Sequence, residues 1–420
     1  MNAWRWKTTA PMVYHGWRVV GAAFLIALFG WGIGFYGPGI YLVVLQERHG
    51  WSTAEISSAI TAYYLLGATL VFFAGAIFER FGARWVVATG ATAMACGVML
   101  LPLLTHFWQI YAAFAVMSLG WAAMSGAAIN IIIAPWFDKR RGLAISLALN
   151  GASAGGLVVA PLMIVLISRL NFAAALFCAA GLMLAVLLPT VALILRCKRP
   201  GEHDPADDDA HAVQPQLPEA ASAAEVRSWQ LGPVLRSGNF QAISIPFALG
   251  LMAQVGFLTH QVAYLSPIVG TVAAGWAISL TTFSAVVGRI VMGFFVDNVD
   301  RRAAACGNFF VQIAGIGVLA SNASATTVYL GCILFGLGVG NMISLPGLIV
   351  QQEFPKQHFS RIVSLIVAIN QFTFACGPGL LGYLQEAQGG YTTALVACLV
   401  MQAAAATIVV LPLIGRMIPR

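Results

Sequence analysis

The stretch Gly75-Ala-Ile-Phe-Glu79-Arg80-Phe81-Gly82-Ala83-Arg84 occurs twice in this chain, the second time in a weaker form. The second copy, 218 residues later, is Gly293-Phe-Phe-Val-Asp297-Asn-Val-Asp300-Arg301-Arg302. In each copy an acid follows the glycine after three residues, and an arginine follows the acid after four more. We call these two stretches the first and second gating loops.

A second pair of matching residues lies further along each half. Asn150 follows Arg141 by nine residues, and Asn370 follows Arg361 by nine residues, which gives an offset of 220. The two offsets agree closely, so the chain consists of two related halves arranged in parallel. Parallel repeats of this kind are typical of membrane carriers whose binding site lies between the halves.

The composition excludes most soluble proteins. Of the 420 residues, 60% are apolar and only 9% are charged, with a mean hydropathy of +0.84. Soluble proteins carry about 25% charged residues. The net charge of +7 could suggest a nucleic-acid binder, but the charges lie in short clusters between long uncharged stretches. This pattern is typical of a polytopic membrane protein.

Twelve stretches are long and apolar enough to cross a bilayer, which takes about 20 residues of helix. The first six are residues 17–45, 55–78, 84–105, 107–134, 142–168 and 172–195. The second six are residues 240–267, 272–296, 303–321, 326–351, 361–385 and 391–415. The predicted fold is an all-α integral membrane protein with two pseudo-symmetric bundles of six helices. Glycine and proline inside the spans, as in Gly37-Pro38-Gly39 and Gly377-Pro378-Gly379, permit close helix contact and local bending.

The domain boundaries follow from the polar stretch between the two sets. Residues 1–196 form the N-terminal bundle, residues 197–239 a polar linker and residues 240–420 the C-terminal bundle. With a cytoplasmic N-terminus, nineteen of the 22 Lys and Arg residues face the cytosol, and Arg48 and Arg169 face the other side. This bias predicts that both termini and the linker are cytoplasmic. We expect a plasma membrane, such as a bacterial inner membrane.

The gating loops have two interpretations. Glycine lets two helices approach, while an acid and an arginine at helix ends can bond the terminus of a neighbouring helix. Such a contact would close the cytoplasmic side in one state and release it in another, with Gly75, Glu79, Arg80, Gly82, Arg84, Gly293, Asp297 and Arg301 as its residues. The alternative is that these charges only fix the orientation of the helices.

The first gating loop, its weaker copy and the layout of six spans, linker and six spans resemble the major facilitator superfamily. The family signature has Asp where this chain has Glu79, and Arg where it has Ala83. Within the superfamily, Gly16-Trp17-Arg18, Gly50-Trp51-Ser52 and Pro135-Trp136-Phe137-Asp138 are similar to the monocarboxylate transporter and oxalate/formate antiporter branch. So is Gly288-Arg289 followed by Gly293 and Asp297.

Arg289 is the only Lys or Arg placed well inside a predicted span. It lies eight residues before Asp297, or about 12 Å along a helix, near the middle of the hydrocarbon layer. A charge there costs at least ~2.5 kcal/mol unless a cavity, a partner or a transported anion compensates it. No acid in the sequence is placed to pair with it, and a guanidinium binds a carboxylate through two parallel hydrogen bonds. We therefore predict that Arg289 anchors a substrate carboxylate; the alternative is that it reaches towards the headgroups. The resemblance implies the same role, because the matching arginine of the branch is its carboxylate anchor.

Asn150 and Asn370 share the depth of Arg289, one in each half, and can contact either the substrate or each other. In the dicarboxylate exchangers of the branch, the position matching Asn370 is basic, so the resemblance implies a substrate with one carboxylate. His260 lies nearer the outer face and is a candidate for a proton site or an outer gate. The remaining polar candidates for binding or packing are Tyr36, Tyr64, Gln254 and Asn341.

These observations favour a secondary carrier of small organic anions, above all monocarboxylates, rather than an enzyme. We expect the lipid bilayer as its surroundings, a proton or a counter-anion as a further partner, and a monomer that needs no cofactor, metal or nucleic acid. The resemblance implies proton symport, but no span holds an acid, so exchange or facilitated diffusion fits at least as well. The chain has no phosphate-cradling loop for ATP.

Two other functions stay open. Gly151, Gly155, Gly156 and Pro161 are similar to the antiporter motif of drug exporters, so efflux of lipophilic compounds is the alternative within transport. A cationic drug would require an acid inside the membrane, and all fifteen acids lie in loops or at the ends of predicted spans. A membrane sensor or a multi-pass enzyme is disfavoured, because no His, Asp and Glu cluster has catalytic or metal-binding spacing.

Overall fold

The computed structural model of the chain describes residues 14–138, 140–196, 202, 231–296, 298–321, 324–355 and 358–417. Every regular element within these ranges is a helix. The first half contains α1 (His15–Gly34), α2 (Gly37–His49), α3 (Thr53–Phe72), α4 (Ala74–Leu100), α5 (Trp108–Met124), α6 (Gly126–Ile133), α7 (Arg141–Ala154), a π-helical turn (Gly155–Val159), α8 (Ala160–Arg169) and α9 (Phe172–Ile194).

The second half begins with the short α12 (Leu231–Arg236), which falls within the range predicted as a linker. It continues with α13 (Gly238–Val269), α14 (Thr271–Phe295), α15 (Arg301–Ser321), α16 (Ala325–Val339), α17 (Leu345–Glu353), α18 (Phe359–Ala375), α19 (Gly377–Gln388) and α20 (Thr392–Met417). The central part of the predicted linker, residues 203–230, lies outside the described residues.

The prediction of an all-helical membrane protein is confirmed. Eleven segments of the described chain are long and apolar enough to cross a membrane. The tenth predicted span differs, because it is divided into the 15-residue α16 and the nine-residue α17 by residues 340–344. Gly338 and Gly340 weaken the helix there, and Pro346 lacks the amide hydrogen that would continue the backbone bonding.

Other spans bend where small residues or proline occur, and the bends follow the internal repeat. The fourth span is divided at Ser125, which corresponds by the 218-residue offset to position 343 in the break between α16 and α17. The fifth span contains the π-helical turn from Gly155, and the eleventh is divided at Cys376, close to the 220-residue offset. The repeat detected in the sequence therefore extends to the shape of individual helices.

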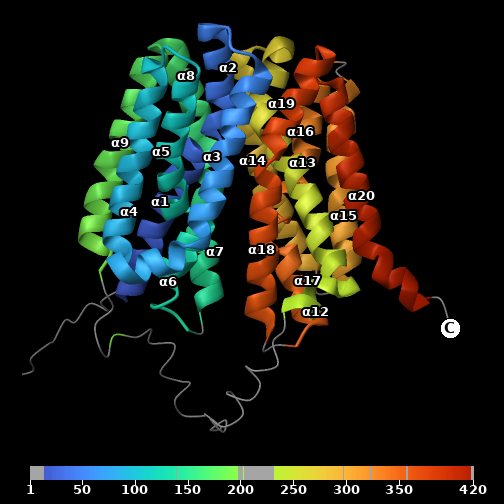
Figure 1. Cartoon of the computed structure of the whole chain (residues 1–420). Coiled ribbons are helices and arrows are strands. Elements are labelled where there is room, and N and C mark those ends of the chain that lie inside the picture. Colours follow the sequence, from blue (N-terminus) through green and yellow to red (C-terminus); the bar gives the residue numbers. More distant parts are fainter. Residues whose placement is uncertain are drawn as a thin grey trace, which may run out of the picture.

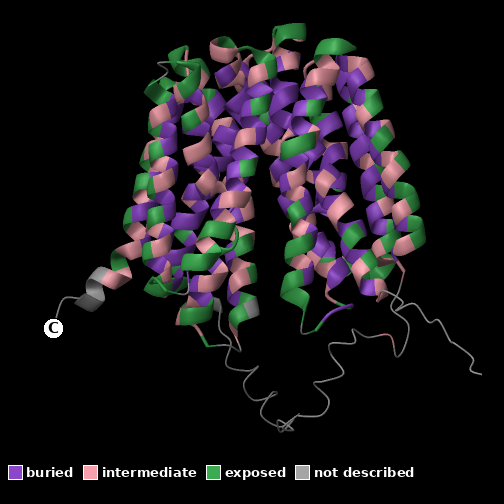
Figure 2. Cartoon of the chain, turned by 180° about the vertical axis from the view of Figure 1, so that it is seen from behind, coloured by how far each residue is buried: buried purple, intermediate pink, exposed green. Residues whose placement is uncertain are grey.

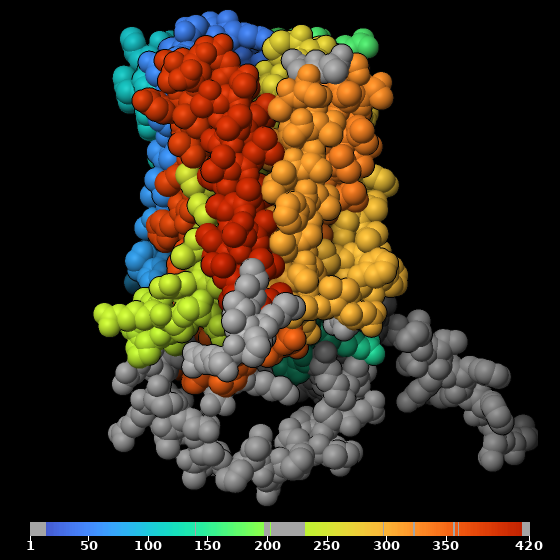
Figure 3. Space-filling model, turned by 90° about the vertical axis from the view of Figure 1, so that its right-hand side faces the viewer, coloured from blue at the N-terminus to red at the C-terminus, as the bar shows by residue number. Residues whose placement is uncertain are grey.

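Figure 1 shows the two halves as two bundles side by side, with α12 and α17 at the end from which the linker leaves. We call this end the linker end and the opposite one the far end. On one side of the molecule α20 packs beside α15, which in turn contacts α16, as the space-filling view in Figure 3 shows. The buried residues gather where the bundles meet at the far end (Figure 2).

The contacts between the bundles lie in the far half. There α3 packs on α18 and α19, α2 on α13, and α8 on α14. Side-chain hydrogen bonds between described residues cross the interface, among them four bonds: from Ala54 N to Glu386 (3.1 Å), between Ser57 and His260 (3.3 Å), from Gly379 N to Thr61 (2.8 Å) and from Ser279 to Leu157 O (3.0 Å). All four involve residues near the far-end termini of their helices or in their far halves. The two bundles are thus joined at the far end.

The start of α3 at this interface has a complete capping box. The Ser52 hydroxyl accepts from Glu55 N at 3.2 Å, and the Glu55 carboxylate accepts from Ser52 N at 2.8 Å. We expect Ser52→Ala to lower the stability by about 1 kcal/mol, because it removes one cap bond. Thermal unfolding in detergent measures the effect. The control is Thr69→Ala, whose hydroxyl bonds only within its own helix, to Leu65 O; an equal shift for both variants would contradict the prediction.

Candidate functional site

Arg289 lies on α14, half-buried, opposite the break between α16 and α17. Its Nε donates to the carbonyl oxygen of Gly340 at 3.2 Å. That carbonyl is available because α16 ends at Val339, so no following helical turn uses it. Among the described residues, Arg289 has no carboxylate partner and its two terminal nitrogens form no hydrogen bond. The side chain is therefore oriented by the backbone but keeps both NH2 groups for another acceptor.

Asn341 holds the break in place. Its Nδ2 donates to Leu337 O at 3.2 Å, to the Asn308 side chain at 3.0 Å and to Gly288 O at 3.4 Å. Asn308 in turn donates to Gly338 O at 3.1 Å. The amide nitrogen of Asn341, a predicted binding residue, is thus used to join α14, α15 and α16 next to Arg289.

Tyr36 reaches the same region from the N-terminal bundle, where the chain breaks between α1 and α2. A Cβ on Gly156, in the π-helical turn, would lie 2.6 Å from both the Tyr36 ring and the Thr282 hydroxyl, so these groups meet there. Thr282 lies seven residues before Arg289 on α14, and Tyr36 is within electrostatic range of Arg289. The structure therefore brings Tyr36 and Arg289 to one region between the bundles.

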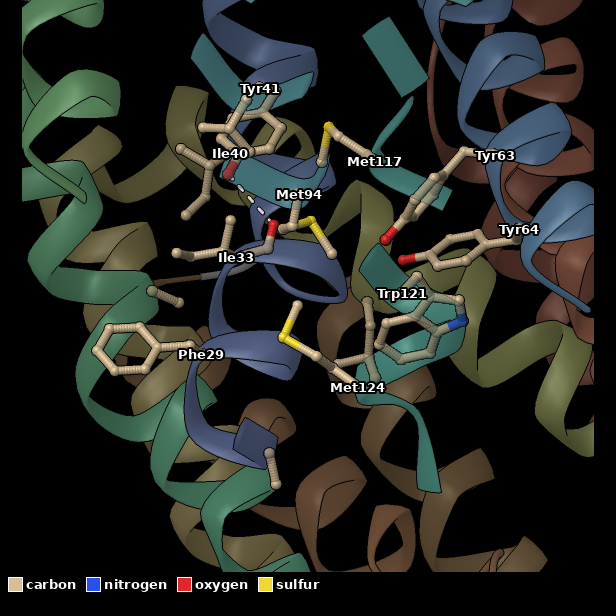
Figure 4. Close-up of a cluster of buried hydrophobic side chains, with 14 of the residues drawn as sticks. Phe29, Ile33, Ile40, Tyr41, Tyr63, Tyr64, Met94, Met117, Trp121 and Met124 are labelled. Atoms are coloured by element: carbon tan, nitrogen blue, oxygen red, sulfur yellow. Dashed lines mark hydrogen bonds between the residues drawn. The ribbon is translucent and has the colours of Figure 1, made fainter. Parts of the chain in front are cut away.

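Tyr64 has a different environment. It is buried and its hydroxyl donates to Phe35 O at 3.1 Å, across the break between α1 and α2. Figure 4 shows Tyr64 beside Trp121, with the rings of Tyr63 and Tyr64 next to each other. Its hydroxyl is thus bonded to the backbone where the helix is broken.

The three remaining predicted amide side chains, Asn150, Asn370 and Gln254, differ in how far they are buried. Asn150 is exposed on α7 and has no hydrogen-bond partner among the described residues. Asn370 on α18 and Gln254 on α13 are buried, and the side-chain oxygen of each lacks a partner in the described part of the chain. A buried oxygen without a donor is costly, so these two amides are suited to accept from water or a ligand.

His260 lies at the joint between the bundles. Its Nε2 is 3.0 Å from Pro378 O, which can only accept, so this nitrogen carries a proton. Its Nδ1 is 3.0 Å from the Tyr391 hydroxyl, and the Ser57 hydroxyl of the N-terminal bundle lies 3.3 Å from Nε2. Both ring nitrogens are therefore bonded within the far-end contact.

The first gating loop lies at the linker end without ion pairs among the described residues. Glu79, Arg80 and Arg84 are exposed, and the arginines lie over the adjacent rings of Phe81 (5.4 Å) and Trp85 (5.9 Å). Gly82 has φ 76°, a conformation that favours glycine, and it kinks α4. Gly75 has open space around it. The bond to a neighbouring helix terminus that we predicted is not formed in this arrangement.

The second gating loop differs from the first. Asp297 lies outside the described residues, and Gly293 is exposed at the end of α14. Arg301 donates to Leu348 O and lies 3.4 Å from the Gln351 side chain. This arginine therefore bonds α17 within its own bundle.

Arg302 is a buried charge that sequence analysis missed. It is 1% exposed and forms a bidentate pair with Glu353, with Nε and one terminal nitrogen 2.6 and 2.7 Å from the two carboxylate oxygens. The guanidinium also donates to Ala242 O and Val409 O, at 3.1 and 2.9 Å. The pair thereby joins α13, α15, α17 and α20 at the linker end. The only feature of the sequence that singled out Arg302 was its alignment with Arg84 in the internal repeat.

Comparison with known proteins places these features in a family. The sequence profile described as Major Facilitator Superfamily matches residues 22–273 and again residues 262–417. Monocarboxylate transporter 13 of Rattus norvegicus is 24% identical over 401 residues, covering 93% of this chain and 87% of the relative. The Fujikurins efflux protein of Gibberella fujikuroi is 27% identical over 412 residues, covering 90% of this chain and 80% of the relative.

Solved structures show the same fold at low sequence identity. A bacterial homologue of the human lysosomal transporter Spinster, in an inward-facing and unoccupied conformation, superposes with a TM-score of 0.69 at 14% identity, covering 94% of this chain and 96% of that one. The nucleoside transporter NupG superposes with a TM-score of 0.67 at 14% identity, covering 96% of this chain and all of that one.

Proposed function

The chain belongs to the Major Facilitator Superfamily, and on that premise we propose that it carries small organic anions with one carboxylate across a membrane. Membership makes it a multi-pass membrane transporter of small molecules rather than an enzyme. The proposal adds the substrate class, with Arg289 as the group that binds the carboxylate.

The observation that carries the proposal is the bonding of Arg289. The guanidinium lies between the bundles, half-buried, with Nε fixed on Gly340 O and both terminal nitrogens without a partner among the described residues. A charge at this depth requires compensation. A carboxylate satisfies two parallel N–H groups at once, and no described acid is paired with Arg289. Asn370 and Gln254, each with a free oxygen, add sites for hydroxyl groups or water.

The arrangement of contacts supports alternating access. The bundles are bonded to each other at the far end, while the first gating loop at the linker end forms no ion pair with any described residue. A structural neighbour with a similar overall arrangement is described as inward-facing. With the termini and linker in the cytoplasm, this arrangement opens the site inwards. In the opposite state Glu79, Arg80 and Arg84 would bond the neighbouring helices, and the far-end contact around His260 would separate.

We infer the mode of energy coupling from the fact that no acid of the described chain is paired with Arg289. Exchange of one anion for another, or facilitated diffusion, needs no proton site and is the mode we propose. His260, with both ring nitrogens bonded at the far-end contact, suits a gate better than a proton carrier. We propose a monomer in a plasma membrane, since the described chain contains one complete pair of bundles.

Efflux is the second candidate. The matched relatives include a fungal protein named for efflux, and Gly151, Gly155 and Gly156 all lie against other helices or side chains around the π-helical turn. Efflux of an organic anion would use the same Arg289 and differ only in direction. Efflux of a cationic compound would require an acid in the middle of a span, and the described spans hold acids only near their ends.

Transport in proteoliposomes tests the proposal. We expect uptake of a labelled monocarboxylate such as lactate, and we expect Arg289→Lys to lower its apparent affinity about tenfold, because lysine keeps the charge but loses the planar fork. The matched control is Arg169→Lys, an exposed arginine at the end of α8. Normal uptake by Arg289→Lys, or extrusion of a cationic dye without any uptake of carboxylates, would overturn the proposal.

A further inference from the structure

Aromatic side chains from both bundles meet where the contacts between the bundles end. Phe35 and Tyr36 come from the break between α1 and α2, and their rings are 5.1 Å apart, edge to face. Phe35 also stacks on Trp121 of α5, with ring centres 6.0 Å apart and an interplanar angle of 21°. We call the group formed by Trp31, Phe35, Tyr36, Tyr64, Trp121 and Phe374 the aromatic cluster.

The cluster spans the interface. Tyr64 of α3 lies 6.0 Å from Phe374 of α18, ring centre to ring centre, so one side of the cluster comes from the C-terminal bundle. Figure 4 shows Tyr64 above Trp121 on neighbouring helices. On α3 this contact lies on the linker side of the bonds made by Ser57 and Thr61. The rings therefore lie just below the closed far end.

The same rings are adjacent to the anion site. Tyr36 meets Thr282, which is two turns before Arg289 on α14, or about 10 Å along the helix. Phe374 follows Asn370 by one turn on α18, so the ring and the buried amide share a helix face. A charged group and a set of aromatic rings thus face one region from two sides.

Several of these side chains keep accessible surface. Trp31, Phe35, Tyr36 and Phe374 are all only half-buried, although they lie in the middle of their spans. Neighbouring aromatic residues outside the cluster, such as Tyr63 and Phe114, are 1% exposed. Aromatic faces favour offset or edge-on contact with another ring, which discriminates a ring from an aliphatic chain of equal size.

We propose that the substrate is a monocarboxylate with an aromatic ring, bound with its carboxylate on Arg289 and its ring against Phe35, Tyr36 and Phe374. This inference rests on the proposed function, because it takes Arg289 as the carboxylate anchor. It adds the chemical class of the part of the substrate that lies away from the carboxylate, which the charge of Arg289 alone does not define.

Equilibrium binding to the purified full chain, measured by calorimetry, tests the inference with three acids. Phenylacetate carries the ring, cyclohexylacetate has the same carbon skeleton size without aromatic character, and acetate has neither. We expect phenylacetate to bind at least ten times more tightly than acetate, and about three to ten times more tightly than cyclohexylacetate, as aromatic pairs predict.

Variants assign the effect to the cluster. Phe374→Leu and Phe35→Leu should each weaken phenylacetate binding about three- to tenfold and leave acetate binding unchanged, since leucine keeps the apolar volume and loses the ring. The control is Phe372→Leu, two residues away on α18, where the side chain is 42% exposed. It should bind all three acids like the parent. Acetate binding also reports that each variant is folded.

The outcomes separate the two proposals. If all three acids bind equally well to the parent, and binding is lost in Arg289→Lys, the aromatic inference is wrong and the anion site stands. If phenylacetate binds equally well to the parent and to Arg289→Lys, the proposed function is wrong. If Phe374→Leu and Phe35→Leu keep the preference of the parent for phenylacetate, the cluster serves only to pack the closed far end, and the inference is overturned.

Discussion

Replacing Arg302 with methionine is expected to lower the stability of the protein by about 3–5 kcal/mol, because it removes the bidentate guanidinium bound to the buried carboxylate of Glu353. Both side chains are almost fully buried, at 1% and 7% exposure, and the pair is bidentate. The guanidinium also satisfies the carbonyls of Ala242 and Val409, so these would lose a donor. Thermal unfolding in detergent, followed by far-UV circular dichroism, measures the loss.

The internal repeat supplies a matched control. Arg84 occupies the corresponding place in the first gating loop, where it is exposed and lies over Trp85 without an ion pair among the described residues. Arg84→Met should therefore change the stability by about 1 kcal/mol or less. The double variant Arg302→Met/Glu353→Leu should recover most of the loss, since the buried carboxylate is removed together with the guanidinium. Similar small shifts for Arg302→Met and Arg84→Met would show that the pair is not structural.

Arg302 also illustrates the limit of prediction from sequence. Arg301 and Arg302 are adjacent in the sequence, and their residue type and charge are the same. On α15 they differ by about 100° of rotation, since a turn takes 3.6 residues, so one faces α17 near the surface and the other faces the bundle interior. The rotation of a helix about its own axis depends on its neighbours. The pattern of a single sequence does not specify that rotation for two adjacent arginines.

The spans themselves were predictable because the bilayer imposes length and apolarity on every crossing. Arg289 was predictable for the same reason, because one charge in such a stretch has to be explained by function or by a partner. The break between α16 and α17 was not predicted, although Gly338, Gly340 and Pro346 are visible in the sequence. Glycine and proline occur in many spans, and only the bonds of Asn341 to Asn308 and Gly288 identify this break as one that holds Arg289.

The partners of His260 depend on tertiary structure in the same way. Its depth along the helix predicted a place towards the far end. Its bonds to Pro378 and Tyr391, and its contact with Ser57, require three other segments from two bundles to be placed first. The sequence can therefore suggest which residue is unusual, while its role follows from what surrounds it.

Replacing Gly39 with leucine is expected to hold the far end open and to lower transport about 100-fold. Gly39 on α2 contacts the backbone of α13 so closely that a Cβ would lie 2.5 Å from the carbonyl oxygen of Thr259. A backbone atom cannot move aside as a flexible side chain can, so the bundles would have to separate at this point. Overpacking of this kind costs about 3 kcal/mol, which corresponds to a population change of about 100-fold.

Labelling with a membrane-impermeant maleimide separates this effect from misfolding. Ser57 is buried at the far-end interface against Gly382 and His260, so Ser57→Cys should react only when the bundles part there. We expect labelling above the background of the native cysteines in Gly39→Leu/Ser57→Cys and not in Ser57→Cys alone. The control Gly21→Leu adds the same side chain on α1, where nothing lies within 4 Å of the Cβ position, and should leave transport unchanged. A carrier that works by alternating access must close this end in each cycle, so a variant held open here should transport slowly. If Gly39→Leu transports at the normal rate and Cys labelling does not rise, the contact between α2 and α13 is not a gate.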